Sequence, residues 1–179
     1  MIKAIYPGTF DPLTNGHLDL LTRTEKIFDL VILAITNNPQ KKTLFNINER
    51  VTMATQATKH LTKVSISSVD GLIVNFAKEK KINILIRGLR TIADFELEIQ
   101  LARINRHLNP EIESIFMLTN ERYSYLSSSI IKELATHGCN LNNFLPKYIA
   151  TAVIEKIKTT KYTSKNKHNK IIYPKTNHD

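Results

Sequence analysis

Short apolar runs rich in β-branched residues alternate along this chain with longer segments of helical spacing. The runs cover Ile2 to Tyr6, Leu30 to Ile35, Val64 to Ile66, Ile82 to Ile86 and Ser114 to Leu118. Continuous apolar runs of this length are typical of strands that are buried on both faces, and such strands form parallel sheets covered by helices. The alternation therefore predicts an α/β fold, with a doubly wound, five-stranded parallel sheet and helices on both of its faces.

Helical spacing between and after these runs predicts six helices. In the first, after Gly16, the side chains of Leu20, Leu21, Ile27 and Phe28 share one face. The second starts at Asn48, an N-cap candidate followed by Glu49 in the first turn, and runs to about His60. The other helices are expected at Gly71 to Lys80, Thr91 to His107, Ser128 to His137 and Pro146 to Lys158.

Length and charge indicate one folded domain followed by a basic tail. The chain has 179 residues, enough for a single domain of ordinary size, and a formal net charge of +9. Six lysines and one acid lie between Lys158 and Asp179, so this segment carries +5 and the rest of the chain +4. Because apolar periodicity stops at Thr159, we expect a single domain over 1–158 and a disordered tail over 159–179.

Composition also excludes several classes of protein. A single cysteine, Cys139, cannot support a disulfide framework or a Cys-rich zinc site, and it suits a reducing compartment. The first apolar stretch is too short for a signal peptide, and no run reaches the roughly 18 apolar residues of a spanning helix. We therefore expect a cytoplasmic protein that binds no membrane, and its basic charge favours an anionic partner.

The loop after the first run has the features of a phosphate site. Ligands of parallel α/β sheets bind beyond the carboxyl ends of the strands, and this loop also enters the first helix, where backbone N–H groups are unpaired. Thr14 and His17 lie three residues apart at the start of that helix, and Gly16 allows close approach of the backbone. Thr9 lies across the turn.

Basic and hydroxyl side chains follow other runs. Lys41 and Lys42 come after the second run, and Arg87 and Arg90 come after the fourth. Arginine binds phosphate through two parallel hydrogen bonds, although an ion pair of Arg87 with Asp94 or Glu98 is the structural alternative. Three serines, Ser127, Ser128 and Ser129, open a later helix and are more than a helix cap needs.

These motifs together resemble a known superfamily. Thr14-Asn15-Gly16-His17 is similar to the Thr-x-Gly-His signature of the nucleotidyltransferases. The wider set resembles the bacterial phosphopantetheine adenylyltransferase family over residues 1 to 158, and an ordered set of motifs is far more specific than one pattern. The set consists of Tyr6-Pro7-Gly8-Thr9-Phe10-Asp11-Pro12, Asn15-Gly16-His17, Leu85-Ile86-Arg87-Gly88-Leu89-Arg90 and Ser127-Ser128-Ser129.

The resemblance implies a Rossmann-like nucleotidyltransferase fold and a reaction. ATP would give its adenylyl group to 4′-phosphopantetheine, with dephospho-coenzyme A and pyrophosphate as products and His17 as the stabiliser of the transition state. Phosphopantetheine would contact Thr9, Lys41, Ile73 and Arg87, although Ile73 suits the core nearly as well. ATP would contact Thr9, Phe10, His17, Gly88, Leu89, Arg90, Glu98, Tyr123, Ser124, Tyr125, Leu126, Ser127, Ser128 and Ser129. Lys132 stands where many members of the superfamily carry arginine.

The resemblance also implies partners. Mg²⁺ would be held mainly by ATP phosphates and water, coenzyme A would act as feedback inhibitor, and the chain would form a homohexamer. One alternative is a sibling enzyme that uses nicotinamide mononucleotide, or CTP with glycerol phosphate. A second is a basic nucleic-acid-binding module, against which stand the lack of tryptophan and of a recognisable nucleic-acid motif.

Overall fold

A five-stranded parallel sheet forms the centre of the protein, whose computed structural model describes residues 1–37 and 42–168. Its strands are β1 Lys3–Gly8, β2 Leu30–Asn37, β3 Val64–Asp70, β4 Ile84–Leu89 and β5 Glu113–Leu118. They lie in the order β3-β2-β1-β4-β5, and every neighbouring pair is parallel. The predicted doubly wound sheet is confirmed. Its strand order changes direction between β1 and β4, which is where ligands of such sheets bind.

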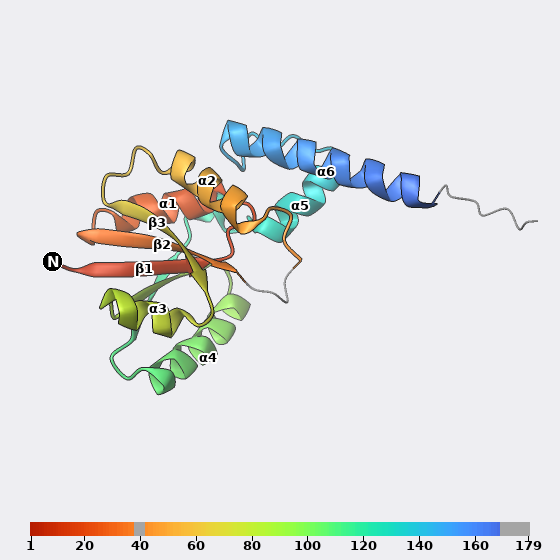
Figure 1. Cartoon of the computed structure of the whole chain (residues 1–179). Coiled ribbons are helices and arrows are strands. Elements are labelled where there is room, and N and C mark those ends of the chain that lie inside the picture. Colours follow the sequence, from red (N-terminus) through yellow and green to blue (C-terminus); the bar gives the residue numbers. More distant parts are fainter. Residues whose placement is uncertain (38–41, 169–179) are drawn as a thin grey trace, which may run out of the picture.

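Helices cover both faces of the sheet (Figure 1). They are α1 Asn15–Thr24, α2 Ile47–Ala57, α3 Ile73–Lys80, α4 Ile92–Leu108, α5 Ser128–Thr136 and α6 Lys147–His168, with a 3₁₀ turn, η1, at Glu121–Tyr123. Figure 1 shows α1 and α2 on one side of the sheet, and α3 and α4 on the other. This arrangement buries both faces of the central strands.

The two faces bury separate sets of apolar side chains. Along β2, Val31, Leu33 and Ile35 join the larger cluster, with α1, α2, α5 and α6. The intervening residues Ile32 and Ala34 point to the smaller cluster, which includes α3. This alternation follows from the two-residue period of a strand, and it explains why the runs read as continuously apolar.

The first two helices differ from the predictions at their ends. The N-cap of α2 is Asn46 and not Asn48, because Asn46 and Glu49 exchange hydrogen bonds with each other's backbone N–H groups, at 2.9 and 2.7 Å. That reciprocal pair is a capping box. The helix ends at Ala57, before His60. The first helix, α1, ends at Thr24, so Ile27 lies beyond it and is 61% exposed, whereas Phe28 is buried.

The last helix is longer than its apolar pattern predicts. It continues to His168, ten residues beyond the expected end at Lys158, so the first part of the expected tail is helical. The rest of that segment, 169–179, lies outside the described residues. Within the described part of the chain, no helix combines the length and apolar character needed to cross a membrane.

Candidate active site

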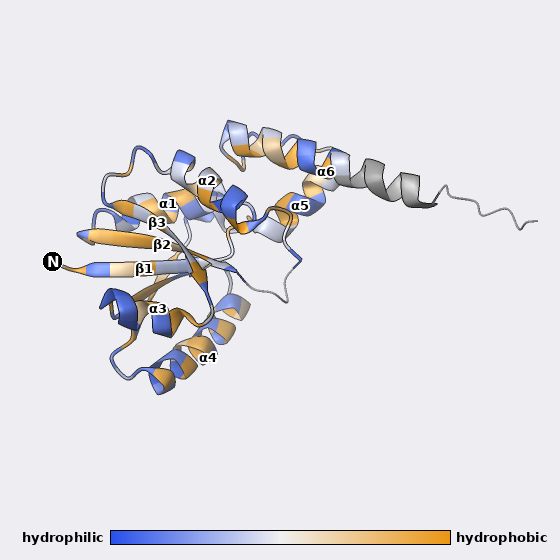
Figure 2. Cartoon of the chain, in the orientation of Figure 1, coloured by the Kyte–Doolittle hydropathy of each residue, from blue (hydrophilic) through white to orange (hydrophobic). Residues whose placement is uncertain are grey.

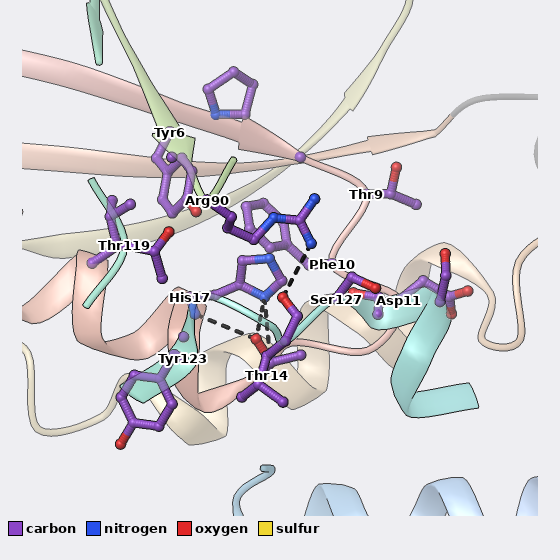
Figure 3. A pocket seen from close by; sticks show the side chains of 18 of the residues that line it. Tyr6, Thr9, Phe10, Asp11, Thr14, His17, Arg90, Thr119, Tyr123 and Ser127 are labelled. Atoms are coloured by element: carbon purple, nitrogen blue, oxygen red, sulfur yellow. Dashed lines mark hydrogen bonds between the residues drawn. The ribbon is translucent and has the colours of Figure 1, made fainter. Parts of the chain in front are cut away.

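A cavity of about 450 Å³ opens beyond the carboxyl ends of β1 and β4, at the point where the strand order changes direction. Side chains from the β1–α1 loop, β4, α4 and the start of α5 line it (Figure 3). The lining includes most of the residues that the sequence assigned to a site, namely Thr9, Phe10, His17, Arg87, Gly88, Arg90, Glu98, Tyr123, Leu126, Ser127, Ser128 and Ser129.

Other assigned residues do not line this cavity. Leu89 is buried in the core, and Ser124 and Tyr125 lie beside lining residues without reaching the cavity. Ile73, at the start of α3, packs against the smaller apolar cluster, which is the core position foreseen as its alternative. Lys41 lies outside the described residues, whereas its neighbour Lys42 lines the cavity.

His17 is fixed by the start of its own helix. Thr14 is the N-cap of α1, and its hydroxyl oxygen accepts a hydrogen bond from the backbone N–H of His17 at 3.4 Å. In return the backbone N–H of Thr14 donates to Nδ1 of His17 at 3.0 Å. This is a capping box in which histidine replaces the usual Glu or Gln. Figure 3 shows these bonds as dashed lines.

The capping box determines the tautomer of His17. Because Nδ1 accepts a hydrogen bond from an amide N–H, it carries no proton. In the neutral ring the proton is therefore on Nε2, which points away from Thr14. Burial, and to a smaller extent the charge of Arg90, lower the pKa of His17 from 6.5 to about 4. At neutral pH His17 is therefore neutral and can donate one hydrogen bond from Nε2.

Aromatic packing holds the same ring from another side. The Phe10 ring meets the rings of His17 and Tyr6 edge to face, with centroids 5.0 and 5.3 Å apart. Phe10 has a left-handed backbone (φ 47°) and is buried. A Cβ on Gly8 would lie 2.7 Å from the Phe10 ring, so the glycine leaves the space that the ring occupies.

Each arginine at the end of β4 has an acidic partner on α4. Nε and Nη2 of Arg87 donate to the two carboxylate oxygens of Glu98 at 2.5 and 2.6 Å. Arg90 pairs with Asp94 and also donates to the backbone carbonyl of Leu126 at 3.1 Å. The ion pair foreseen as the alternative for Arg87 is therefore present, with Glu98 and not Asp94 as its partner. Both arginines nevertheless line the cavity.

The serines at the start of α5 have distinct bonds. Ser127 is the N-cap and accepts from the N–H of Ile130 at 3.1 Å, while the Ser128 hydroxyl donates to the carbonyl of Pro12 at 2.9 Å. Ser129 is exposed at the rim. The first N–H groups of a helix lack partners within it, so this end of α5 presents donors suited to an anion.

Asp11, Lys132 and Thr119 also line the cavity. Asp11 and Thr119 were not singled out from the sequence, and Lys132 was noted without a role. The carboxylate of Asp11 accepts from Nζ of Lys132 at 3.0 Å, across 121 positions of sequence, and no local pattern signals such a contact. Thr119 directly follows β5, so the rule that ligands bind at strand ends could have indicated it.

Comparisons with known proteins identify the family of the chain. Residues 5–134 match the model of the cytidylyltransferase-like family. The phosphopantetheine adenylyltransferase of Sodalis glossinidius (strain morsitans) is 54% identical over 151 residues, which cover 84% of this chain and 94% of that protein. The fold is also similar to that of a crystal structure from Vibrio parahaemolyticus assigned as a nicotinate-nucleotide adenylyltransferase, with a TM-score of 0.63. The match covers 86% of this chain and 92% of that one at 16% sequence identity, so it supports the fold alone. The chain belongs to the cytidylyltransferase-like nucleotidyltransferases and, among them, to the phosphopantetheine adenylyltransferase family.

Proposed function

We propose that this protein transfers the adenylyl group of ATP to 4′-phosphopantetheine, which gives dephospho-coenzyme A and pyrophosphate. The observation that carries the proposal is that His17, Arg87, Arg90 and the start of α5 line one cavity at the switch point of the sheet. The 54% identity to a phosphopantetheine adenylyltransferase supports this choice of acceptor.

In the proposed reaction the acceptor phosphate attacks the α-phosphorus of ATP in line with the departing pyrophosphate. A phosphate is already anionic near neutral pH, so no general base is needed. Nε2–H of His17 would donate to a non-bridging oxygen of the α-phosphate, and the bond strengthens as that oxygen gains charge in the transition state. The ring is held by Thr14 and Phe10 before substrate arrives, so it need not reorganise during the reaction.

The two substrates would occupy different sides of the cavity. The β- and γ-phosphates of ATP suit the N–H groups at the start of α5, close to Ser129 and Lys132. Thr9 and Arg87, at the ends of β1 and β4, line the cavity together with Lys42. These three side chains would hold the acceptor phosphate, together with Lys41, whose role stays a prediction. The adenine contacts expected for Tyr123 and the residues after it also stay predictions.

Magnesium in this reaction would depend on the substrate for its ligands. No group of three His, Cys, Asp or Glu residues within 1–37 and 42–168 could hold a metal ion. The carboxylates in the cavity, Asp11 and Glu98, are paired with Lys132 and Arg87. We therefore expect Mg²⁺ to be bound by ATP phosphates and water, where it would neutralise phosphate charge.

The proposal is tested by supplying acceptors one at a time. Purified protein with ATP and Mg²⁺ should release pyrophosphate when 4′-phosphopantetheine is the acceptor. It should release no pyrophosphate when nicotinamide mononucleotide is the acceptor, or when CTP and glycerol 3-phosphate are supplied. His17→Ala serves as the control for a contaminating enzyme. Release with another acceptor and none with 4′-phosphopantetheine would show the sibling activity instead.

Self-association is supported by one surface. No residue of α4 is buried, yet Leu97, Leu101, Ile104 and Leu108 form an apolar row along it at spacings of four, three and four residues. This α4 row is 37–57% exposed, and Figure 2 shows apolar residues along the helix. Rows of this kind are typical of helices that pack against a partner. We propose that α4 contributes to the interface of a homo-oligomer; the hexamer and feedback inhibition by coenzyme A stay predictions.

A further inference from the structure

Two buried charged side chains of opposite sign hold the same short segment of backbone. Asp11 is 2% exposed and binds the backbone of Leu44 and Phe45, and Arg50 is 1% exposed and binds the backbone of Phe45. This segment directly follows Lys42 and Thr43, which line the cavity. Burying a charged side chain costs free energy unless the charge is fully paired. Two such side chains beside the cavity therefore indicate a specific role.

Asp11 binds the N–H side of the segment. Its Oδ2 accepts from the backbone N–H of Leu44 at 2.8 Å, and its Oδ1 accepts from that of Phe45 at 2.9 Å. A third bond, from Nζ of Lys132 to Oδ2 at 3.0 Å, connects the carboxylate to α5. A carboxylate is the side chain that can accept from two successive amides and a cation together.

Arg50 binds the carbonyl side. From α2 its Nε donates to the carbonyl of Phe45 at 3.2 Å, and its Nη1 donates to the carbonyls of Thr9 and Thr36 at 2.8 and 2.9 Å. One rigid guanidinium thus joins the segment to the end of β2 and to the loop that carries Thr9. Lysine, with a single nitrogen on a flexible stem, cannot reproduce this fork.

The N-terminal end of α5 is fastened by other bonds. Ser128 binds the carbonyl of Pro12, and Arg90 binds the carbonyl of Leu126 just before the helix. Only the Lys132 bond joins Asp11 to that side of the cavity among these contacts. Loss of Asp11 or Arg50 therefore loosens Thr9, Lys42 and Thr43 more than it loosens the start of α5.

We propose that Asp11 and Arg50 are positioning residues, which keep Lys42 and Thr43 at a fixed separation from Thr9 so that the acceptor phosphate meets a preformed site. The inference rests on the proposed function, which places the acceptor phosphate on this side. Small displacements of groups that orient a substrate are enough to lower its rate of reaction strongly. Neither side chain needs to touch the substrate for this role.

The test compares Asp11→Asn and Arg50→Lys with two other variants. Asparagine keeps the shape of aspartate but can no longer accept from both amides and Lys132. In each positioning variant the KM for 4′-phosphopantetheine should rise about tenfold, while the KM for ATP changes by less than about twofold. Tyr148→Phe, which removes a partly buried hydrogen bond to the carbonyl of Met53 away from the cavity, should alter neither constant. Lys132→Met should not reproduce the rise for the acceptor.

Amide hydrogen exchange gives a readout that does not depend on turnover. In Asp11→Asn the amides of Leu44 and Phe45 should lose protection, whereas those of β5 should keep it. Equal increases of both KM values, an unchanged KM for the acceptor, the same pattern in Lys132→Met, or unaltered exchange would overturn the inference. If the wild-type chain releases no pyrophosphate with 4′-phosphopantetheine, the proposed function fails, and exchange at Leu44 and Phe45 still decides whether Asp11 holds the segment.

Discussion

The guanidinium of Arg87 binds the carboxylate of Glu98 through two parallel hydrogen bonds, from Nε at 2.5 Å and from Nη2 at 2.6 Å. The pair is half-buried, and Nη1 of Arg87 also donates to the carbonyl of Pro7 at 3.3 Å. A residue of α4 thus sets the orientation of a cation that projects from β4. The acid beside a phosphate site is explained by the arginine that it holds.

Glu98→Gln should lower kcat/KM about tenfold, because glutamine cannot accept both bonds and leaves Arg87 less well oriented. Steady-state kinetics with both substrates measures the effect. The matched control is Glu113→Gln, which removes the exposed ion pair between Arg106 and Glu113 and should change kcat/KM by less than about twofold. Equal losses in the two variants would show that Glu98 acts only through stability.

His17→Asn should keep the helix and lose the reaction. The asparagine oxygen can accept from the N–H of Thr14 as Nδ1 does, but the side chain carries no donor where Nε2 lies. We expect kcat to fall by about 10² to 10³, with a circular dichroism spectrum like that of the wild type. His17→Ala should lose at least as much turnover. Turnover near the wild-type value in either purified variant would contradict the proposed role.

Stability should depend on pH through the same histidine. The pKa of His17 is lowered from 6.5 to about 4, first by burial and then by Arg90, so between these values the unfolded chain binds a proton that the folded chain does not. The free energy of unfolding therefore falls as pH falls through this range, and His17 contributes a loss of about 2 kcal/mol between pH 8 and pH 5. Urea denaturation should show a larger loss in the wild type than in His17→Asn. Identical losses would contradict a lowered pKa.

Gly8→Ala should disturb both stability and turnover. Its Cβ would lie 2.7 Å from the ring of Phe10, which is 5% exposed and packs against His17. We expect a destabilisation of about 2 kcal/mol, measured by thermal or urea unfolding, with a lower kcat. A smaller side chain should relieve the clash, so the same substitution in a Phe10→Leu background should cost less. Equal costs in both backgrounds would show that the ring is not the obstacle.

A charge on α4 should weaken the self-association that we propose for this helix. Leu101→Glu and Ile104→Lys each place a charge in the exposed α4 row, and sedimentation velocity should show a smaller species than the wild type forms. Glu96→Lys, on the same helix but outside the row, is the control. A monomeric wild type, or unchanged sedimentation of both variants, would remove α4 from the interface.

The strands and several cavity residues could be predicted from local rules, whereas Phe10, Gly88, Glu98, Tyr123 and Leu126 were assigned to the site only through the family resemblance. Apolar runs marked β1 to β5, and the strand-end rule led to His17, Arg87 and the serines of α5. Helix ends depended on competition between neighbours: Asn46 and Asn48 are both possible caps, and the spacing of Asn46 from Glu49 decides for Asn46. Ile27 was expected on the same helix face as Leu20 and Phe28, but α1 ends at Thr24, three residues before it.

The roles of Asp11 and Arg50 could not be predicted, because they depend on contacts between residues far apart in the sequence. Asp11 binds Leu44, Phe45 and Lys132, which lie 33, 34 and 121 positions away, and Arg50 binds Thr9 across 41 positions. Nothing in the neighbouring residues of the sequence distinguishes such side chains from solvated charges. Charged residues buried by the tertiary fold become visible only when the fold has been built.

One imidazole serves two separate demands, because Nδ1 of His17 belongs to the helix cap and Nε2 to the cavity. A helix with no other task would carry glutamate or glutamine at this position. Glutamate or glutamine at position 17 would therefore preserve the helix cap but remove the Nε2–H donor. A screen for folded protein would accept such variants, and a screen for activity would reject them. Selection for folding therefore acts on one nitrogen of the His17 ring, and selection for function acts on the other.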